Sequence, residues 1–352
     1  MADESDPGFC YSVDTFGKKL DFKKDEDVQK VVEEIKACKN LTSIRLSNTS
    51  VSIEAAKAIA DAIAEHYEIE IANFSDCFTG RLLTEIPQAV ASFGEALMNK
   101  QNLKVIDFSD NAFGPVGARA VHKLISHNIN LEELRFVNNG LGTQGGQMMA
   151  SAIETACDNA EEAGRDYGLK TFKAGRNRLE DLAATELAES FKMCPHLKEV
   201  AMPQNGTTKV GFVALFAAFA GKDMEIINMN DNTATEVGAK AVAEAIRTMK
   251  NLQKIDLGDC MLREEGCIAV CEAIQQSGNT GLKSIDMAFA DIEEEQAENV
   301  ADAMALMLRT QTELESFRIS GNEMEDDEVL ERLYAVLDTT VGREVLVYED
   351  EE

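Results

Sequence analysis

One apolar pattern, repeated about every 28 residues, constrains this 352-residue chain more than any other feature. Each copy has apolar residues at its first, fourth and sixth positions and usually an Asn or Cys at its ninth, which we call the frame position. The frame position recurs at Thr49, Cys77, Asn111, Asn139, Asn177, Asn205, Asn232, Cys260, Ala290 and Asn322. Ten copies at this spacing indicate one structural unit that is stacked along the chain.

Each part of the pattern has a structural reason. Alternating apolar residues predict a short strand with one buried face, and successive strands would form a parallel sheet. An Asn side chain can pair with the backbone groups that a buried turn leaves open, and a Cys can fill the same place. Residues 239–246 have the apolar spacing of a helix. The sequence predicts an α/β leucine-rich-repeat solenoid, a ribonuclease-inhibitor-like horseshoe with the sheet on the concave face and helices on the convex face.

The pattern also predicts the domain organisation. Residues 1–40 form an N-terminal cap, residues 41–325 carry about ten repeats, and residues 326–352 form a C-terminal cap with a short acidic tail. Two intervals exceed the usual spacing, one after Arg81 and one around residues 158–168. Insertions in solenoids map to loops on one face. The spacing leaves open whether these loops are merely tolerated or functional.

Composition narrows the function classes. The formal net charge of −29 argues against nucleic-acid or anionic-membrane partners and favours a partner with a basic face. No apolar run is long enough to span a bilayer, and the acidic N-terminus has no apolar core of a signal peptide. The eight cysteines show no paired spacing, so we expect reduced thiols.

Signatures of catalysis are scarce. The four histidines show neither metal-ligand nor triad spacing, and Cys267 and Cys271 are best explained as helix packing. Residues 278–284 resemble a phosphate-binding loop, but Leu282 separates the second glycine from the lysine. The sequence therefore favours a protein that acts on a partner over an enzyme with its own substrate site.

The loops that follow the strands are the remaining candidates. The residue just before the frame position is polar in several copies, and the frame itself does not explain it. We expect these residues to project from one edge and form a partner-binding row, although a merely solvated edge is the alternative. The residues concerned are Asp76, Asp110, Asn138, Arg176 and Asp231.

Seven segments resemble Ran GTPase-activating proteins: FSDCFTGRLLTEIP at 74–87, then FSDNAFGPVGA, VNNGLGTQGG, KAGRNRLE, MPQNG, NMNDNTATEVGA and LGDC. Two motifs within them, FTGR-x-x-x-EIP and GRNRLE, lie outside the generic apolar frame, which makes the resemblance specific. The resemblance runs in order from about residue 40 to residue 325.

The resemblance implies an activator of the small GTPase Ran rather than an enzyme with its own cofactor, since Ran carries the GTP and Mg²⁺. Arg81 would be the natural arginine finger from sequence alone. The family is instead understood to use an asparagine, matched here by Asn138, which helps fix Ran's own catalytic glutamine. Leu83 stands where many members have a basic residue, so this chain departs from the family pattern at that position.

The resemblance also implies partners and a place in the cell. Ran in its GTP state would bind this chain, alone or together with a Ran-binding protein. The chain would be a cytoplasmic monomer that supports nucleocytoplasmic transport, and attachment at the nuclear envelope is left open. The expected partner-binding residues are Arg81, Asp76, Asp110, Asn111, Asn139, Arg176 and Asp231.

Two other classes stay open. A stoichiometric binding or inhibitor protein of the ribonuclease-inhibitor kind shares the repeat, but it predicts abundant Cys and Trp, and this chain has eight Cys and no Trp. A purely structural scaffold would leave the segments around Arg81 and Arg176 unexplained.

Overall fold

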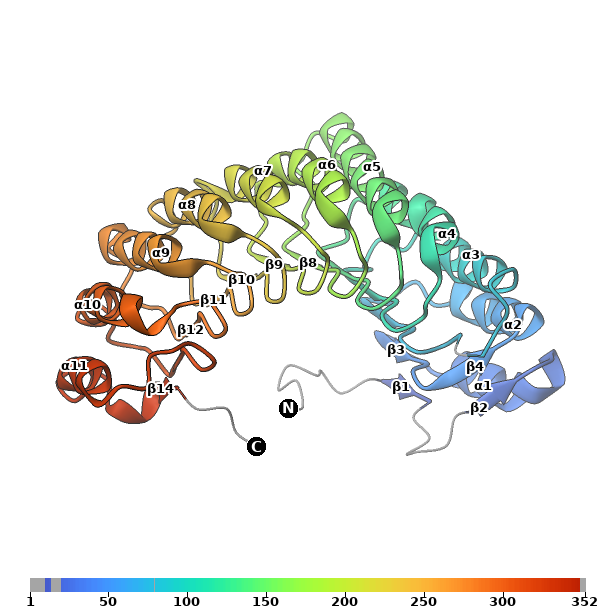
Figure 1. The fold of residues 1–352 in the computed structure, drawn as a ribbon. Coiled ribbons are helices and arrows are strands. Elements are labelled where there is room, and N and C mark those ends of the chain that lie inside the picture. The colour runs from blue at the N-terminus through green and yellow to red at the C-terminus, as the bar shows by residue number, and fades with distance from the viewer. Residues whose placement is uncertain (1–9, 14–19, 79, 349–352) are drawn as a thin grey trace. The chain divides into compact units, whose positions relative to one another are not determined.

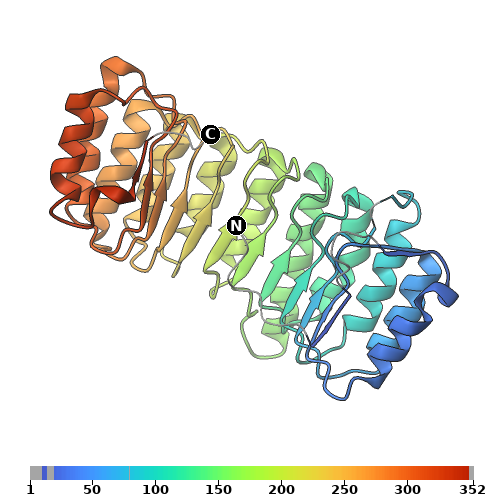
Figure 2. The same cartoon turned by 90° about the horizontal axis from the view of Figure 1, so that it is seen from below.

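The structure is a computed structural model that describes residues 10–13, 20–78 and 80–348. It divides into two compact units, unit 1 (Met1–Leu169) and unit 2 (Lys170–Glu352). In each unit, short strands alternate with helices, and the helices lie on one side of the strands (Figure 1). Figure 2 shows the strands of each unit running side by side with the helices behind them.

Unit 1 has a parallel sheet in the order β1-β3-β5-β6-β7, with β2 and β4 forming a separate parallel pair. Its helices pack on their sequence neighbours, α1 on α2 through α4 on α5. The strands are β1 (Tyr11–Ser12), β2 (Leu20–Phe22), β3 (Ser43–Arg45), β4 (Thr49–Val51), β5 (Ile71–Asn73), β6 (Val105–Asp107) and β7 (Glu133–Arg135). The helices are α1 (Asp25–Ala37), α2 (Ile53–Ala64), α3 (Ile86–Leu97), α4 (Gly114–His127) and α5 (Gly142–Glu162).

Unit 2 repeats the arrangement, with its parallel strands in sequence order from β8 to β14. The strands are β8 (Thr171–Lys173), β9 (Glu199–Ala201), β10 (Ile226–Asn228), β11 (Lys254–Asp256), β12 (Ser284–Asp286), β13 (Ser316–Arg318) and β14 (Leu346–Val347). The helices are α6 (Glu180–Lys192), α7 (Lys209–Phe219), α8 (Thr235–Ile246), α9 (Arg263–Ser277), α10 (Ala297–Leu308) and α11 (Asp327–Leu337), with 3₁₀ turns η1 (Glu294–Gln296) and η2 (Arg343–Val345).

The frame fits this fold copy by copy, and the predicted α/β leucine-rich-repeat solenoid is confirmed. Every copy places one three-residue strand around its fourth position, from β3 to β13 with the β4 pair set apart. The fourth positions of neighbouring copies face each other in register, as Ile106 does with Leu134. Both side chains are fully buried, so the apolar residues build a continuous core within each unit.

The frame asparagines form a ladder of hydrogen bonds inside each unit. In unit 1, the Asn111 N–H donates to Oδ1 of Asn139 at 3.0 Å. In unit 2, the Asn177 and Asn205 N–H groups donate to the next asparagine's Oδ1, at 3.0 and 3.1 Å. Where Cys260 replaces asparagine, its Sγ donates to the Met229 carbonyl at 3.1 Å. The predicted role of the frame position in satisfying buried backbone groups is confirmed.

The two long intervals have different structures. The second was expected to be a surface loop, but much of it extends α5, which has 21 residues, whereas the other helices have 11–15. Ala152, Ala156 and Ala160 are buried along this helix, so additional apolar turns accommodate the extra residues. In the first interval, residues 83–85 form a turn that leads directly into α3, which begins at Ile86 and Pro87.

The segment predicted as a C-terminal cap contains helix α11. Helix α11 starts after Asp326, whose Oδ1 accepts a hydrogen bond from the Glu328 N–H at 2.8 Å. The predicted acidic end at 349–352 lies outside the described residues, as does the acidic start of the chain. Within the described part of the chain, no helix is long and apolar enough to cross a membrane.

Candidate functional site

The residue before the frame position has a left-handed backbone conformation throughout. In unit 1, φ is 46° at Asp76, 61° at Asp110 and 54° at Asn138. In unit 2, it is 57° at Arg176 and 52° at Asp231. Asn and Asp tolerate this conformation better than most other residues with a side chain. The aspartates and the asparagine that the frame did not explain therefore have a backbone cause in addition to any role in binding, whereas the backbone does not explain Arg176.

In unit 1, Asp110 and Asn138 are exposed and adjacent. The Asn138 Nδ2 donates to Oδ1 of Asp110 at 2.8 Å, and the Asp110 N–H donates to the Val137 carbonyl at 2.8 Å. Asp76 lies one repeat earlier and is half-buried. The bond to the carboxylate uses one of the two N–H donors of this amide, so the carboxamide oxygen and the second N–H of Asn138 can meet a partner.

Unit 2 carries a second row of the same kind. Arg176 is exposed, and Asp231 is half-buried. Gln204 occupies the same place one repeat before Asp231, and its Nε2 donates to Oδ2 of Asp231 at 2.6 Å. Sequence reasoning missed Gln204, although its position before the frame residue Asn205 was a sufficient signal.

Asn111 and Asn139 were expected among the partner-binding residues, but the structure buries both side chains. The Asn139 Nδ2 donates to the Phe108 carbonyl at 2.9 Å. The Asn111 Oδ1 accepts the Cys77 N–H at 2.7 Å. Since both amides are enclosed and bound to the backbone, we revise their role from direct contact to support of the exposed loops.

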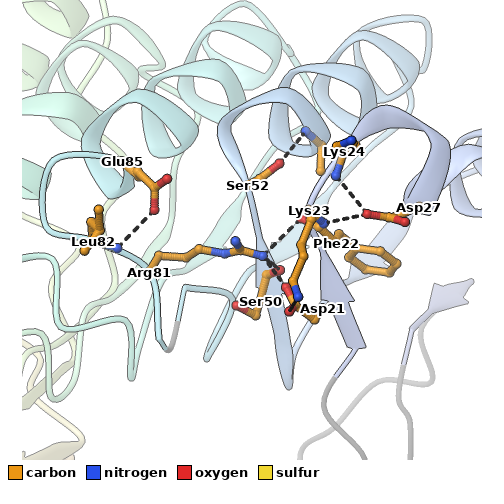
Figure 3. Close-up of polar contacts among 11 residues, drawn as sticks. Asp21, Phe22, Lys23, Lys24, Asp27, Ser50, Ser52, Arg81, Leu82 and Glu85 are labelled. Carbon is orange, nitrogen blue, oxygen red and sulfur yellow. Dashed lines mark hydrogen bonds and ion pairs between the residues drawn. The ribbon is translucent and has the colours of Figure 1, made fainter.

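Arg81 is tied into the N-terminal cap (Figure 3). Its guanidinium pairs with the carboxylate of Asp21 and donates to the Phe22 carbonyl at 3.1 Å and the Ser50 carbonyl at 2.6 Å. Only 13% of its side chain is exposed. These contacts link the loop after β5 to strand β2 and to β4. Asp21 was missed by sequence reasoning, because 60 residues separate it from Arg81.

The residues after Arg81 present an apolar surface. Leu82 is 67% exposed and Leu83 is 71% exposed. The Leu82 N–H donates to Oε2 of Glu85 at 3.1 Å (Figure 3). The Glu85 N–H donates back to the Leu82 carbonyl at 2.9 Å. The turn is therefore held at both ends, by Arg81 and by Glu85, while its two leucines face solvent.

Replacing Arg81 with alanine is expected to loosen the β2–β4 pair. Amide exchange at Ser52, whose N–H donates to the Phe22 carbonyl at 2.8 Å, should accelerate by about tenfold, since the bonds lost are worth roughly 1–2 kcal/mol net. Hydrogen exchange followed by mass spectrometry measures this. Lys23→Ala is the matched control, because it removes only an exposed ion pair to Asp21. Unchanged exchange in Arg81→Ala would show that the clamp does not hold the pair.

Two carboxylates lie in register on the strands of unit 2. Asp256 on β11 pairs with Asp286 on β12, and the Gly258 N–H donates to Oδ1 of Asp256 at 3.1 Å. Burial raises the pKa of Asp256 to about 6, and repulsion from the Asp286 carboxylate adds to the rise. Arg318 Nη1 lies 3.7 Å from Oδ2 of Asp286 and offsets part of this repulsion.

This pair predicts a pH-dependent stability. An acid whose folded pKa lies above its ordinary value of 3.8 stabilises the fold fully below that value, and the contribution is lost as pH rises through about 6. Asp256→Asn should therefore raise the free energy of unfolding at pH 7.5 by about 1 kcal/mol, and by much less at pH 4. Thermal unfolding at both pH values tests this. The exposed Asp259→Asn is the control, and an equal gain at both pH values would refute the assignment.

No group of three or more His, Cys, Asp or Glu side chains that could hold a metal ion occurs among the residues that the structure describes. Cys267 and Cys271 are buried thiols in α9, as their spacing predicted. Burial raises the pKa of Cys267 to about 12, which disfavours a reactive thiolate. Among the described residues, the polar edge of the loops is the candidate site.

The stacked strand–helix units and their asparagine ladder define a leucine-rich-repeat protein. A family model described as Leucine Rich repeat matches residues 99–121 and 127–150. Ran GTPase-activating protein 1 of Saccharomyces cerevisiae is 30% identical over 319 residues, which are 88% of this chain and 78% of that protein. This chain belongs to the Ran GTPase-activating protein family.

Other relatives match over shorter stretches. Ran GTPase-activating protein 1 of Xenopus laevis is 41% identical over 193 residues, 54% of this chain and 33% of that protein. Ran GTPase-activating protein of Drosophila melanogaster is 37% identical over 205 residues, 57% of this chain and 34% of that protein. The matched stretch thus spans about a third of these two relatives.

Proposed function

We propose that this chain stimulates GTP hydrolysis by the small GTPase Ran. The observation that carries the proposal is the exposed Asn138 amide, held by Asp110 at 2.8 Å in a chain that belongs to the family. Ran would supply the nucleotide and Mg²⁺, and this chain would need no cofactor of its own. We place this activity in the cytoplasm, in support of nucleocytoplasmic transport, with a monomeric activator.

The proposed mechanism is positioning. In the complex, the Asn138 carboxamide would hydrogen-bond the catalytic glutamine of Ran, which orients the attacking water. Restricting that glutamine to its productive orientation removes rotational freedom before the chemical step, which is a main source of catalysis in phosphoryl transfer. The left-handed turn and the bond to Asp110 fix the amide before Ran arrives, so little ordering is needed during binding.

The surroundings of Arg81 favour this mechanism over an inserted arginine. An arginine finger must reach the phosphates of the partner. Arg81 is mostly enclosed and bonded to Asp21 and to the Phe22 and Ser50 carbonyls. Extending it toward a nucleotide would break all three contacts, two of which are hydrogen bonds to backbone carbonyl groups. We propose that Arg81 shapes the partner-facing turn and affects binding more than chemistry.

Phosphate release from Ran·GTP in the presence of a small fraction of an equivalent of this protein tests the function. We expect many phosphates released per molecule of activator, and no acceleration with an unrelated small GTPase. A stoichiometric binding protein would instead give no acceleration, or would inhibit in proportion to its concentration. Either of those results would refute the proposed activity.

A further inference from the structure

Helix α7 in unit 2 is apolar on all sides. Its sequence, KVGFVALFAAF, contains one charged residue, Lys209, at its first position. Phe212, Phe216 and Phe219 are fully buried on the inner side. A helix on the surface of a soluble protein is expected to be polar on its outer side, and a helix that is apolar all round is expected to be covered.

The outer side of α7 nevertheless faces solvent. Val210 is 55% exposed and Val213 is 44% exposed. Ala217 is exposed and Ala214 is half-buried. These four residues follow the spacing of a single helical stripe, which another helix can contact along its length. The alanines in the stripe would let a second backbone approach closely.

The neighbouring helices extend this stripe into a patch. Leu182 in the first turn of α6 is 55% exposed, and Val237 in the first turn of α8 is 52% exposed. Helix α7 packs on both of these helices. We call the set Leu182, Val210, Val213, Ala217 and Val237 the α7 surface. A patch on three adjacent helices differs from the isolated apolar side chains that most surfaces carry.

The α7 surface is held rigidly. The Asp181 carboxylate of α6 accepts hydrogen bonds from the Thr208 and Gly211 N–H groups at the start of α7, at 2.7 and 3.0 Å. The Thr208 hydroxyl donates to the same carboxylate at 2.6 Å. A Cβ atom on Gly211 would lie 3.0 Å from Cβ of Ala184. The first turns of α6 and α7 are therefore joined, and a partner would meet a surface that is already formed.

Acidic side chains flank the apolar stripe. Helix α6 carries Glu180, Asp181, Glu186 and Glu189 against a single cation, Lys192, which is paired with Glu189 at 2.7 Å. Helix α8 carries Glu236 and Glu244, its Lys240 is paired with Glu265 of α9 at 2.6 Å, and Arg247 at its end is paired with Glu244 at 2.6 Å. The cations of both flanks are thus already paired and are outnumbered by carboxylates, so the flanks would attract a partner with basic edges.

We propose that the α7 surface docks an amphipathic helix of another protein, apolar along one face and basic along both edges. This mode of recognition places spaced apolar anchors against a complementary helical stripe. A second copy of this chain fits less well, because two chains of net charge −29 repel each other. An anionic membrane is disfavoured for the same reason. The proposal involves no residue of the Asn138 edge and stands apart from the proposed function.

A labelled peptide of about 18 residues, built from Leu on one face and Lys on the other, is a direct probe of the full chain. Fluorescence anisotropy should detect binding of this peptide to the wild-type protein. A peptide in which Glu replaces Lys should show no binding. Val213→Glu should weaken binding of the basic peptide by at least about tenfold, although it adds a negative charge. Val116→Glu on α4, also at an exposed valine (58%), is the matched control and should bind like the wild type.

An unchanged circular dichroism spectrum of the Val213→Glu protein would show that the fold is retained. Unchanged stimulation of GTP hydrolysis by Ran would show that the proposed function is retained. Binding retained by Val213→Glu would mean attraction by charge alone and would overturn the proposal. An equal loss in Val116→Glu would do the same. Sedimentation of the wild type as a dimer that Val213→Glu abolishes would assign the surface to a second copy instead.

Discussion

Replacing Asn138 with glycine is expected to lower kcat for hydrolysis of Ran-bound GTP on the order of 10²–10³-fold, the usual effect of removing one preorganised transition-state contact. Glycine removes the carboxamide and its bond to Asp110, yet it adopts the φ of 54° at this position without strain. The melting temperature should therefore stay close to that of the wild type. Steady-state phosphate release and thermal unfolding measure the two effects separately.

The choice of glycine follows from the backbone. Alanine is the usual substitution for removing a side chain, but alanine in a left-handed conformation costs roughly 1 kcal/mol. Comparing the two variants separates this strain from the missing amide. Both should lose kcat to a similar degree, and only the alanine variant should lose stability. Full kcat in both variants would remove Asn138 from the mechanism.

Asn111→Ala should lower the free energy of unfolding by about 3 kcal/mol, because several buried backbone groups lose their partners at about 1–3 kcal/mol each. The Asn111 Oδ1 accepts the Cys77 and Phe78 N–H groups at 2.7 and 3.2 Å. Its Nδ2 donates to the Phe74 and Phe108 carbonyls, both at 2.8 Å. Urea denaturation measures the loss.

The neighbouring Asp110→Asn is a suitable control for this prediction, because asparagine tolerates the left-handed backbone and the side chain is exposed. We expect it to change the free energy of unfolding by less than about 0.5 kcal/mol. If Asn111→Ala had an effect as small as this control, the asparagine ladder would not contribute to stability as the hydrogen bonds imply.

The repeated elements could be predicted because their cause is local. Each strand needs its apolar residues at the fourth and sixth frame positions, and Ile255 and Leu257 are buried there as expected. The asparagine role was also predictable, since an amide is the side chain that both donates and accepts. Repetition strengthened these inferences, because each copy tested the same pattern again.

What the sequence did not indicate depends on residues far apart or on backbone conformation. The pairing of Arg81 with Asp21 joins a loop to a strand outside the repeat frame. The spacing of the repeats therefore does not predict this contact. The sequence did not indicate the left-handed turn at Asn138. An asparagine before the frame position is compatible both with a left-handed backbone and with a contact to a partner. The apolar composition of α7 can be read from the sequence. Only the structure shows that Val213 faces solvent while the adjacent Phe212 is buried.

Single-turnover hydrolysis of Ran-bound GTP at saturating activator tests the central claim most directly. At saturation, binding defects no longer limit the rate, so the observed constant reports the chemical step. We predict that Arg81→Ala retains nearly the wild-type rate constant, having lost mainly affinity, whereas Asn138→Gly loses about 10²–10³-fold. If Arg81→Ala abolished the chemical step while Asn138→Gly kept the full rate, Arg81 would be an inserted arginine finger and the mechanism would be wrong.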